Sequence, residues 1–128
     1  MTGRRRGRDR GQASVELALL LPVVVLLLLA VLQVGLVARD VVLVTHASRE
    51  AARAAATDPA RGAALAAARA SSGLNPDRLS VRVSGRGEAG SRVRVEVTYR
   101  SPTAVPLVGA FLGDRTITSS ATMRVEGP

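Results

Sequence analysis

An uninterrupted apolar segment near the N-terminus restricts this chain more than any other feature. Residues 17–38 are 22 consecutive positions without a charged side chain, and Gln33 is the only polar one among them. As a helix the segment is about 33 Å long, close to the about 30 Å of a bilayer's hydrocarbon core. A buried helix in a 128-residue domain would not need apolar side chains all round. The sequence therefore predicts a transmembrane helix at residues 12–38, in which Gln33 either bonds a neighbouring helix or lies near the outer interface.

The residues before this segment predict its orientation. Residues 1–11 form a basic leader, with five Arg against one Asp in positions 2–10, whereas Arg39 and Asp40 cancel on the other side. Positive residues stay in the cytoplasm, so we expect a single-pass protein of the cell membrane with a cytoplasmic N-terminus and an extracytoplasmic C-terminal domain. A cleaved secretory signal is disfavoured, because its apolar region is usually shorter and GLVARD is a poor cleavage site.

Helical patterning continues beyond the apolar run, which predicts an extracytoplasmic helical region at residues 39–70. Residues 39–57 contain neither Gly nor Pro, so the first helix should extend from Ser14 to Thr57. Asp58 and Pro59 should then cap and begin a second, Ala-rich helix over residues 60–70, either a kinked continuation or a turn back. One face of the first helix collects small and apolar residues, namely Val41, Val44, Ala47, Ser48, Ala51 and Ala55.

Residues 71–128 predict a small antiparallel β domain. Segments 79–84 and 91–99 alternate strictly and are joined by the Gly-rich residues 85–90, as in a hairpin. Segment 116–126 alternates again after the Pro- and Gly-broken loop 101–114. The residues expected to face inward are Val81, Val83, Val93, Val95, Val97, Tyr99, Ile117, Ala121, Met123 and Val125. Three strands with one apolar face need a cover, and the Ala-rich helix is the nearest candidate.

The predicted fold class is therefore α+β: a long N-terminal helix whose first half spans the membrane, a short Ala-rich helix and a three-stranded antiparallel sheet. Only 21 of the hydrophobic residues in positions 39–128 are larger than Ala. Small side chains bury little apolar area, so such a domain favours an assembly component over a free enzyme.

A single acid stands at the edge of the apolar run. Glu16 directly precedes Leu17 and follows Gly11 by five positions. A carboxylate facing hydrocarbon is costly and persists where a partner compensates it. Taken singly, Glu16 is also consistent with an interfacial acid near a helix N-terminus, and Gly11 with a flexible residue after a basic tail.

The whole junction resembles the signal of type IV pilin-like proteins, which a prepilin peptidase cleaves after Gly. Cleavage after Gly11 would make Gln12 the first residue and Glu16 the fifth, which is the position of the acid in that pattern. The resemblance implies that Glu16 pairs with the free amine of Gln12 in an adjacent subunit and so aligns neighbouring helices. Such a pair is strong in low dielectric, and each unpaired charge is penalised.

More of the chain resembles TadE-like proteins, which are pilin-like subunits of tight-adherence pilus systems. The resemblance depends on the Gly11-to-Glu16 start, Pro22, Gly35, the REAARAAA segment at 49–56 and the ending SSATMRVE at 119–126. It implies a minor pilin or pseudopilin, acting with other pilin-like subunits and the assembly machinery of a tight-adherence (Flp type IVb) pilus or related secretion apparatus. Leu17 departs from the aromatic residue that many such pilins carry after the Glu.

Other classes of function find little support in the sequence. There is no Cys, and the single His46 has no neighbours at metal-ligand spacing, so neither a metal site nor a cofactor is expected. No nucleophile elbow or phosphate-binding loop is present, so we expect no enzyme. The Arg-rich leader is interpreted as a topology signal rather than a nucleic-acid site. The alternative function is an uncleaved single-pass anchor that presents a small interaction domain.

Overall fold

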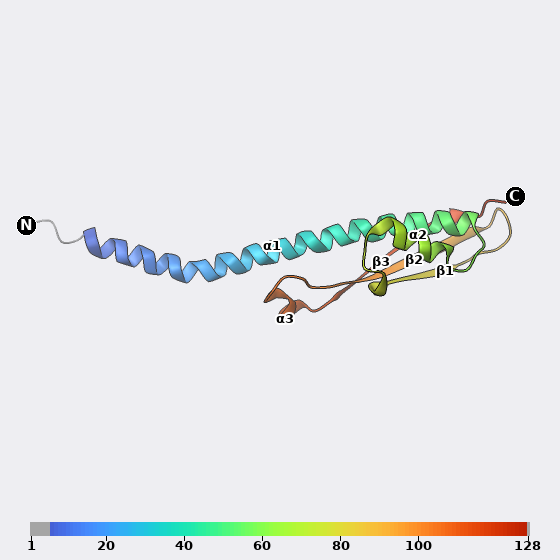
Figure 1. Cartoon of the computed structure of the whole chain (residues 1–128). Coiled ribbons are helices and arrows are strands. Elements are labelled where there is room, and N and C mark those ends of the chain that lie inside the picture. The colour runs from blue at the N-terminus through green and yellow to red at the C-terminus, as the bar shows by residue number, and fades with distance from the viewer. Residues whose placement is uncertain (1–5, 128) are drawn as a thin grey trace, which may run out of the picture.

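One helix runs through almost half of the chain. The structure, a computed structural model, describes residues 6–127, with side chains from residue 11 onward. Helix α1 spans Arg6–Thr57, and its 52 residues correspond to a length of about 78 Å. Figure 1 shows α1 as a bowed rod whose C-terminal half lies against the other elements. The predicted end at Thr57 is confirmed, but the helix begins at Arg6 rather than near Ser14; residues 1–5 of the leader lie outside the described part.

The chain turns back after α1 into helix α2, Ala63–Ser72, which packs against α1. The prediction that Asp58 and Pro59 begin the second helix is wrong. The Asp58 carboxylate instead accepts a hydrogen bond from the Ala60 backbone N–H at 2.8 Å, which closes a turn. Gly62, with φ of 96°, precedes α2, because reversing the chain there requires a left-handed residue.

Three antiparallel strands form the sheet in the order β1-β2-β3. The strands are β1 at Leu79–Ser84, β2 at Arg92–Ser101 and β3 at Arg115–Arg124, and a short 3₁₀ turn, η1 at Pro76–Arg78, leads into β1. Val95 of β2 lies between Val83 of β1 and Ala121 of β3. The predicted α+β class and all three strands are confirmed. Sequence patterning missed helix α3, Val108–Leu112, inside the loop expected over 101–114.

The core lies between α1, α2 and the inner face of the sheet. Residues that α1 contributes include Val44, Ala47 and Ala51, and β2 contributes Val93, Val95 and Val97, all fully buried. Both β2 and β3 pack against α1, which covers the sheet together with the Ala-rich helix α2.

Two residues expected in this core are exposed. Val83 is 42% exposed because β1 is an edge strand, and α1 packs chiefly on β2 and β3. Val41 is 44% exposed, because it lies at the margin of the helix face that begins contacting the sheet near Val44. The core of the domain therefore contains fewer residues than the sequence pattern indicates.

Candidate functional site

The segment from Gly11 to Glu16 lies in the N-terminal turns of α1, where every described side chain is exposed. Gln12 and Glu16 are one turn apart on the same face, and the Gln12 Nε2 atom is 3.5 Å from Glu16 Oε1. A Cβ atom built on Gly11 would meet no atom within 4 Å. The structure thus brings Gln12 and Glu16 together and leaves open space where a side chain on Gly11 would lie.

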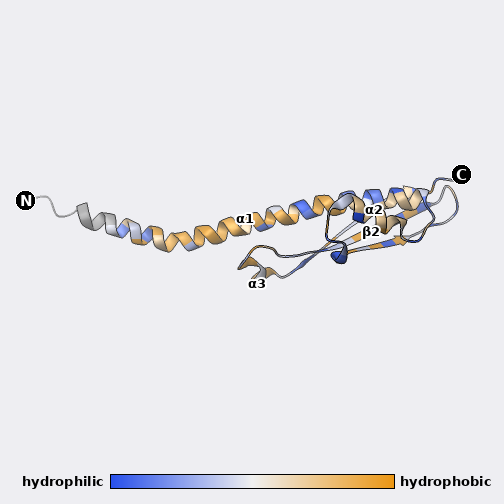
Figure 2. Cartoon of the chain, viewed as in Figure 1, coloured by the Kyte–Doolittle hydropathy of each residue, from blue (hydrophilic) through white to orange (hydrophobic). Residues whose placement is uncertain are grey.

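The apolar half of α1 follows Glu16 and lies outside the domain core. Its exposed large side chains extend from Val15 to Val34, and Figure 2 shows this stretch of the ribbon coloured mainly as hydrophobic. The most apolar window has a mean hydropathy of 3.0, and none of it is buried. Contiguous apolar surface of this extent is rare on soluble monomers. By length and composition, this one helix is able to cross a membrane.

Gln33 interrupts this exposed surface. It is only 5% exposed, whereas its neighbours Leu32 and Val34 are exposed, and its Oε1 atom has no hydrogen-bond partner. The sequence did not indicate that Gln33 would be buried within the chain, and the two alternatives, a bond to a neighbouring helix or a place near the outer interface, stay predictions. The segment that lies beside this part of α1 is the β2–β3 connection, which carries α3 (Figure 1).

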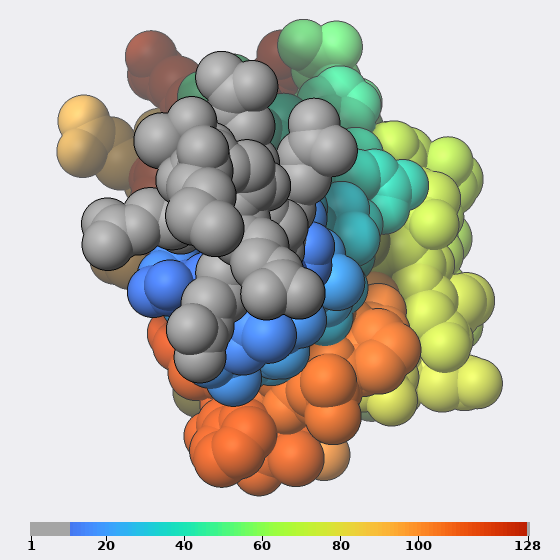
Figure 3. All heavy atoms as spheres, turned by 90° about the vertical axis from the view of Figure 1, so that its left-hand side faces the viewer, coloured from blue at the N-terminus to red at the C-terminus, as the bar shows by residue number. Residues whose placement is uncertain are grey.

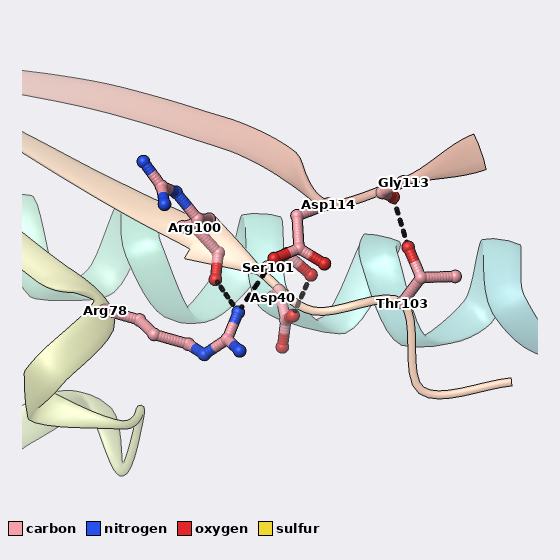
Figure 4. Close-up of polar contacts among 7 residues, drawn as sticks. All are labelled: Asp40, Arg78, Arg100, Ser101, Thr103, Gly113 and Asp114. Carbon is pink, nitrogen blue, oxygen red and sulfur yellow. Dashed lines mark hydrogen bonds and ion pairs between the residues drawn. The ribbon is translucent and has the colours of Figure 1, made fainter. Parts of the chain in front are cut away.

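Polar contacts fix the base of that connection to the rest of the molecule (Figure 4). The Ser101 hydroxyl donates to Asp40 Oδ2 at 2.6 Å, which joins the end of β2 to α1. Arg78 Nη1 lies 3.2 Å from Asp114 Oδ2 and also donates to the Arg100 carbonyl at 3.4 Å. We call these contacts, with the hydrogen bond from the Thr103 hydroxyl to the Gly113 carbonyl, the neck.

Asp40 was interpreted from the sequence only as a charge that cancels Arg39. In the structure it is 9% exposed and lies 3.9 Å from the Arg39 guanidinium. A nearly buried carboxylate needs hydrogen-bond donors, and Ser101 supplies one from 61 positions away. The lack of charged residues in 102–113 is the sequence feature that sets this loop apart. No pattern in these residues indicated that the loop would dock on α1.

Within residues 11–127, whose side chains the structure describes, no group of three or more His, Asp or Glu side chains is arranged to hold a metal ion. His46 is exposed on α1.

Together, the fold and the site define a chain with one long helix, half of it apolar and uncovered, and a small α+β domain on the other half. The family model described as TadE-like protein matches residues 11–53, from Gly11 to within four residues of the end of α1. The resemblance to the TadE-like family is thereby confirmed over this segment. No curated protein and no solved structure matches the chain.

Proposed function

We propose that this protein is a membrane-spanning, minor pilin-like or pseudopilin-like subunit. It acts in the assembly of a tight-adherence (Flp type IVb) pilus or a related secretion apparatus. The observation that carries the proposal is the match of the TadE-like family model to the part of α1 with the uncovered apolar half and the acid at its edge. Leu and Val side chains favour transfer into the bilayer by about 0.3–0.6 kcal/mol each, and the run contains sixteen of them.

The proposed processing step is cleavage between Gly11 and Gln12 by a prepilin peptidase. The open surroundings of Gly11 favour access by an enzyme. Gly also weakens a helix by about 1 kcal/mol relative to Ala, so the helix unwinds more easily at Gly11 than it would at an Ala.

The proposed role of Glu16 is to align neighbouring subunits after cleavage. Its side chain is exposed and lies where the apolar surface begins. The new amine at Gln12 would lie one helical turn away, about 6 Å along the axis. In parallel helices of adjacent subunits, pairing this amine with Glu16 favours one register, because an unpaired charge at the bilayer edge is costly.

Intact mass tests the cleavage. Co-expression with a prepilin peptidase should remove eleven residues and leave Gln12 at the N-terminus. Gly11→Leu should block cleavage, whereas the matched variant Gly7→Leu, inside the leader, should be cut normally. An unchanged mass of the parent beside an active peptidase would refute the processing step.

Association with other pilus components tests Glu16. Glu16→Ala should insert and be cleaved normally but associate about tenfold or more weakly, because an interfacial charge pair contributes about 1.5 kcal/mol or more. Glu88→Ala removes an exposed acid from the β1–β2 connection and should leave association unchanged. Equal association of Glu16→Ala and the parent would exclude the alignment role.

The second candidate function is an uncleaved single-pass anchor that presents the α+β domain. The observation that favours it is the continuity of α1 through Gly11, since the peptide bond after Gly11 lies inside a helix. The mass measurement above distinguishes the two functions, because the anchor keeps its leader.

A further inference from the structure

The connection between β2 and β3 carries an uncharged, apolar tip. Residues 102–113 contain no charged side chain, although Arg100, Asp114 and Arg115 flank them. Phe111 is 89% exposed, and Leu107 and Leu112 are exposed as well. Three large apolar side chains presented together on a twelve-residue loop indicate a contact surface rather than a solvated loop.

This tip lies beside the apolar half of α1, near the level of Gln33 along the helix. Figure 1 shows α3 displaced from the sheet toward the N-terminal half of α1, and Figure 3, viewed along α1 from its N-terminal end, shows the loop's orange atoms directly below the blue atoms of α1 in that projection. Helix α3 contacts α1, and Gln33, in the apolar run of α1, is buried. Gln33 lies five residues before the end of the apolar run, which is about 8 Å along the helix.

The neck holds the tip in this position. Ser101 is bonded to Asp40 on α1, and Asp114 is paired with Arg78 beside β1. Both ends of the loop are therefore anchored at the boundary between the apolar run and the domain. The tip projects from that boundary toward the N-terminal end of the chain.

Part of the backbone of the tip forms hydrogen bonds within the tip itself. This lowers the cost of placing the tip in a shallow apolar environment. Two of its residues, Pro102 and Pro106, have no N–H group to satisfy. The backbone hydrogen bonds within the tip run from Val108 to Pro106, from Gly109 to Val105 and from Gly113 to Gly109. Irregular backbone is excluded from lipid-exposed positions in the hydrocarbon core, so the headgroup–acyl boundary, about 5–10 Å deep, fits better.

We infer that Leu107, Phe111 and Leu112 insert into the headgroup–acyl boundary of the extracytoplasmic leaflet and form a second membrane contact beside α1. The inference rests on the proposed spanning of the membrane by α1. Lipid is the favoured occupant because the tip lies level with α1 surface that lipid covers in that function. The tip also offers no charged group with which to select a protein partner.

The absence of Trp from the sequence provides a direct test with single-Trp variants of the full chain. Phe111→Trp reports on the tip, Leu28→Trp on the middle of the apolar run, and Val83→Trp on the exposed sheet edge. Each is reconstituted in vesicles of phosphatidylcholine and phosphatidylglycerol that contain lipids brominated at defined depths. Iodide in the external solution serves as the aqueous quencher.

Phe111→Trp should emit at shorter wavelength than Val83→Trp and be quenched several-fold more by shallow bromines than by deep ones. Leu28→Trp should be quenched most by deep bromines. If Phe111→Trp behaves like Val83→Trp while Leu28→Trp is quenched, the tip contact is refuted and the membrane span is retained. If Leu28→Trp is not quenched, both proposals fail.

A second copy of the chain is the competing occupant, and the same probes identify it. One outcome would overturn the lipid contact and indicate a second copy instead. In it, the Trp of Phe111→Trp is shielded from iodide but is not quenched by brominated lipid, and the shielding is lost when the protein is diluted in lipid. Adding Leu112→Glu to Phe111→Trp should abolish the shallow quenching. Adding Val83→Glu instead should leave it unchanged.

Discussion

At the scale of single residues, Asp40 joins the long helix to the sheet. Its carboxylate is nearly buried, and the hydroxyl of Ser101 approaches it to 2.6 Å. The Arg39 side chain is 66% exposed and 3.9 Å away, so its attraction is largely screened by solvent. The hydrogen bond from Ser101 is therefore the main local compensation for burying this charge.

Removing that donor should weaken the fold. We expect Ser101→Ala to lower the free energy of unfolding by about 1–3 kcal/mol, because it leaves a buried acceptor unsatisfied. Denaturant unfolding in detergent micelles measures the change. Ser80→Ala is the matched control, since its exposed hydroxyl lies 3.5 Å from the Thr98 carbonyl, and it should change stability by less than about 0.5 kcal/mol. Equal effects of the two variants would contradict the role assigned to Ser101.

For Gln33 we predict the opposite effect, namely that replacing the side chain stabilises a contact instead of weakening it. Its Oε1 atom is buried without a partner, so Gln33→Leu should strengthen the docking of the β2–β3 connection on α1. Amide hydrogen exchange in residues 102–113 should slow by about tenfold or more if about 1.4 kcal/mol is recovered. Gln12→Leu removes an exposed amide from the same helix and should not change this exchange. Faster exchange in Gln33→Leu would show that the amide supports the docked loop.

At the scale of elements, small side chains allow the two helices and the sheet to pack closely. Fully or nearly fully buried alanines lie on both helices, at Ala47, Ala51, Ala52, Ala55 and Ala56 of α1 and Ala64 and Ala68 of α2. Each buries little area, so this contact depends on close approach more than on bulk.

A larger residue in this contact should therefore be costly. Ala51→Leu places three extra carbons at a fully buried position and should destabilise the domain by about 1–3 kcal/mol. Ala66→Leu makes the same change at an exposed position of α2 and should have an effect within about 0.5 kcal/mol. Thermal unfolding of the two variants checks this, and an undiminished midpoint for Ala51→Leu would contradict close packing.

Local sequence patterns predicted the elements better than their tertiary contacts. Alternation located β1 at its observed bounds, and the Asp58–Pro59 pair marked the end of α1 at Thr57. The environment of Asp40 was not predictable, because it depends on Ser101, which lies 61 positions away, and no local pattern in the apolar run indicated the burial of Gln33. Likewise, the exposure of Val83 follows from its place on an edge strand, which alternation cannot indicate. In the candidate site, Gly11, Gln12 and Glu16 were identified by family resemblance, whereas the neck required the fold.

At the scale of the whole molecule, α1 belongs to two environments. Its apolar run carries exposed large apolar side chains from Val15 to Val34, and its C-terminal half packs against the sheet; Figure 2 shows the first part of the ribbon mainly in orange and the second in mixed colours. The proposed topology assigns the first half to the bilayer and the second to the extracytoplasmic side.

Cysteine labelling tests this topology without background, because the natural sequence contains no Cys. Glu88→Cys, in the exposed β1–β2 connection, should react with a membrane-impermeant maleimide in intact cells. Thr2→Cys, in cells without a prepilin peptidase, should react only after permeabilisation. The reverse pattern would invert the orientation that the Arg-rich leader predicts.

The continuity of α1 also has a mechanical consequence. Residues 39–57 extend the apolar run by about 28 Å as part of the same unbroken helix, so this part of α1 acts as a lever on the domain. A tilt of about 20° in the bilayer would swing its far end sideways by about 10 Å, carrying the sheet with it. In the proposed membrane-spanning function, local lipid thickness would then change how far the domain extends sideways over the membrane.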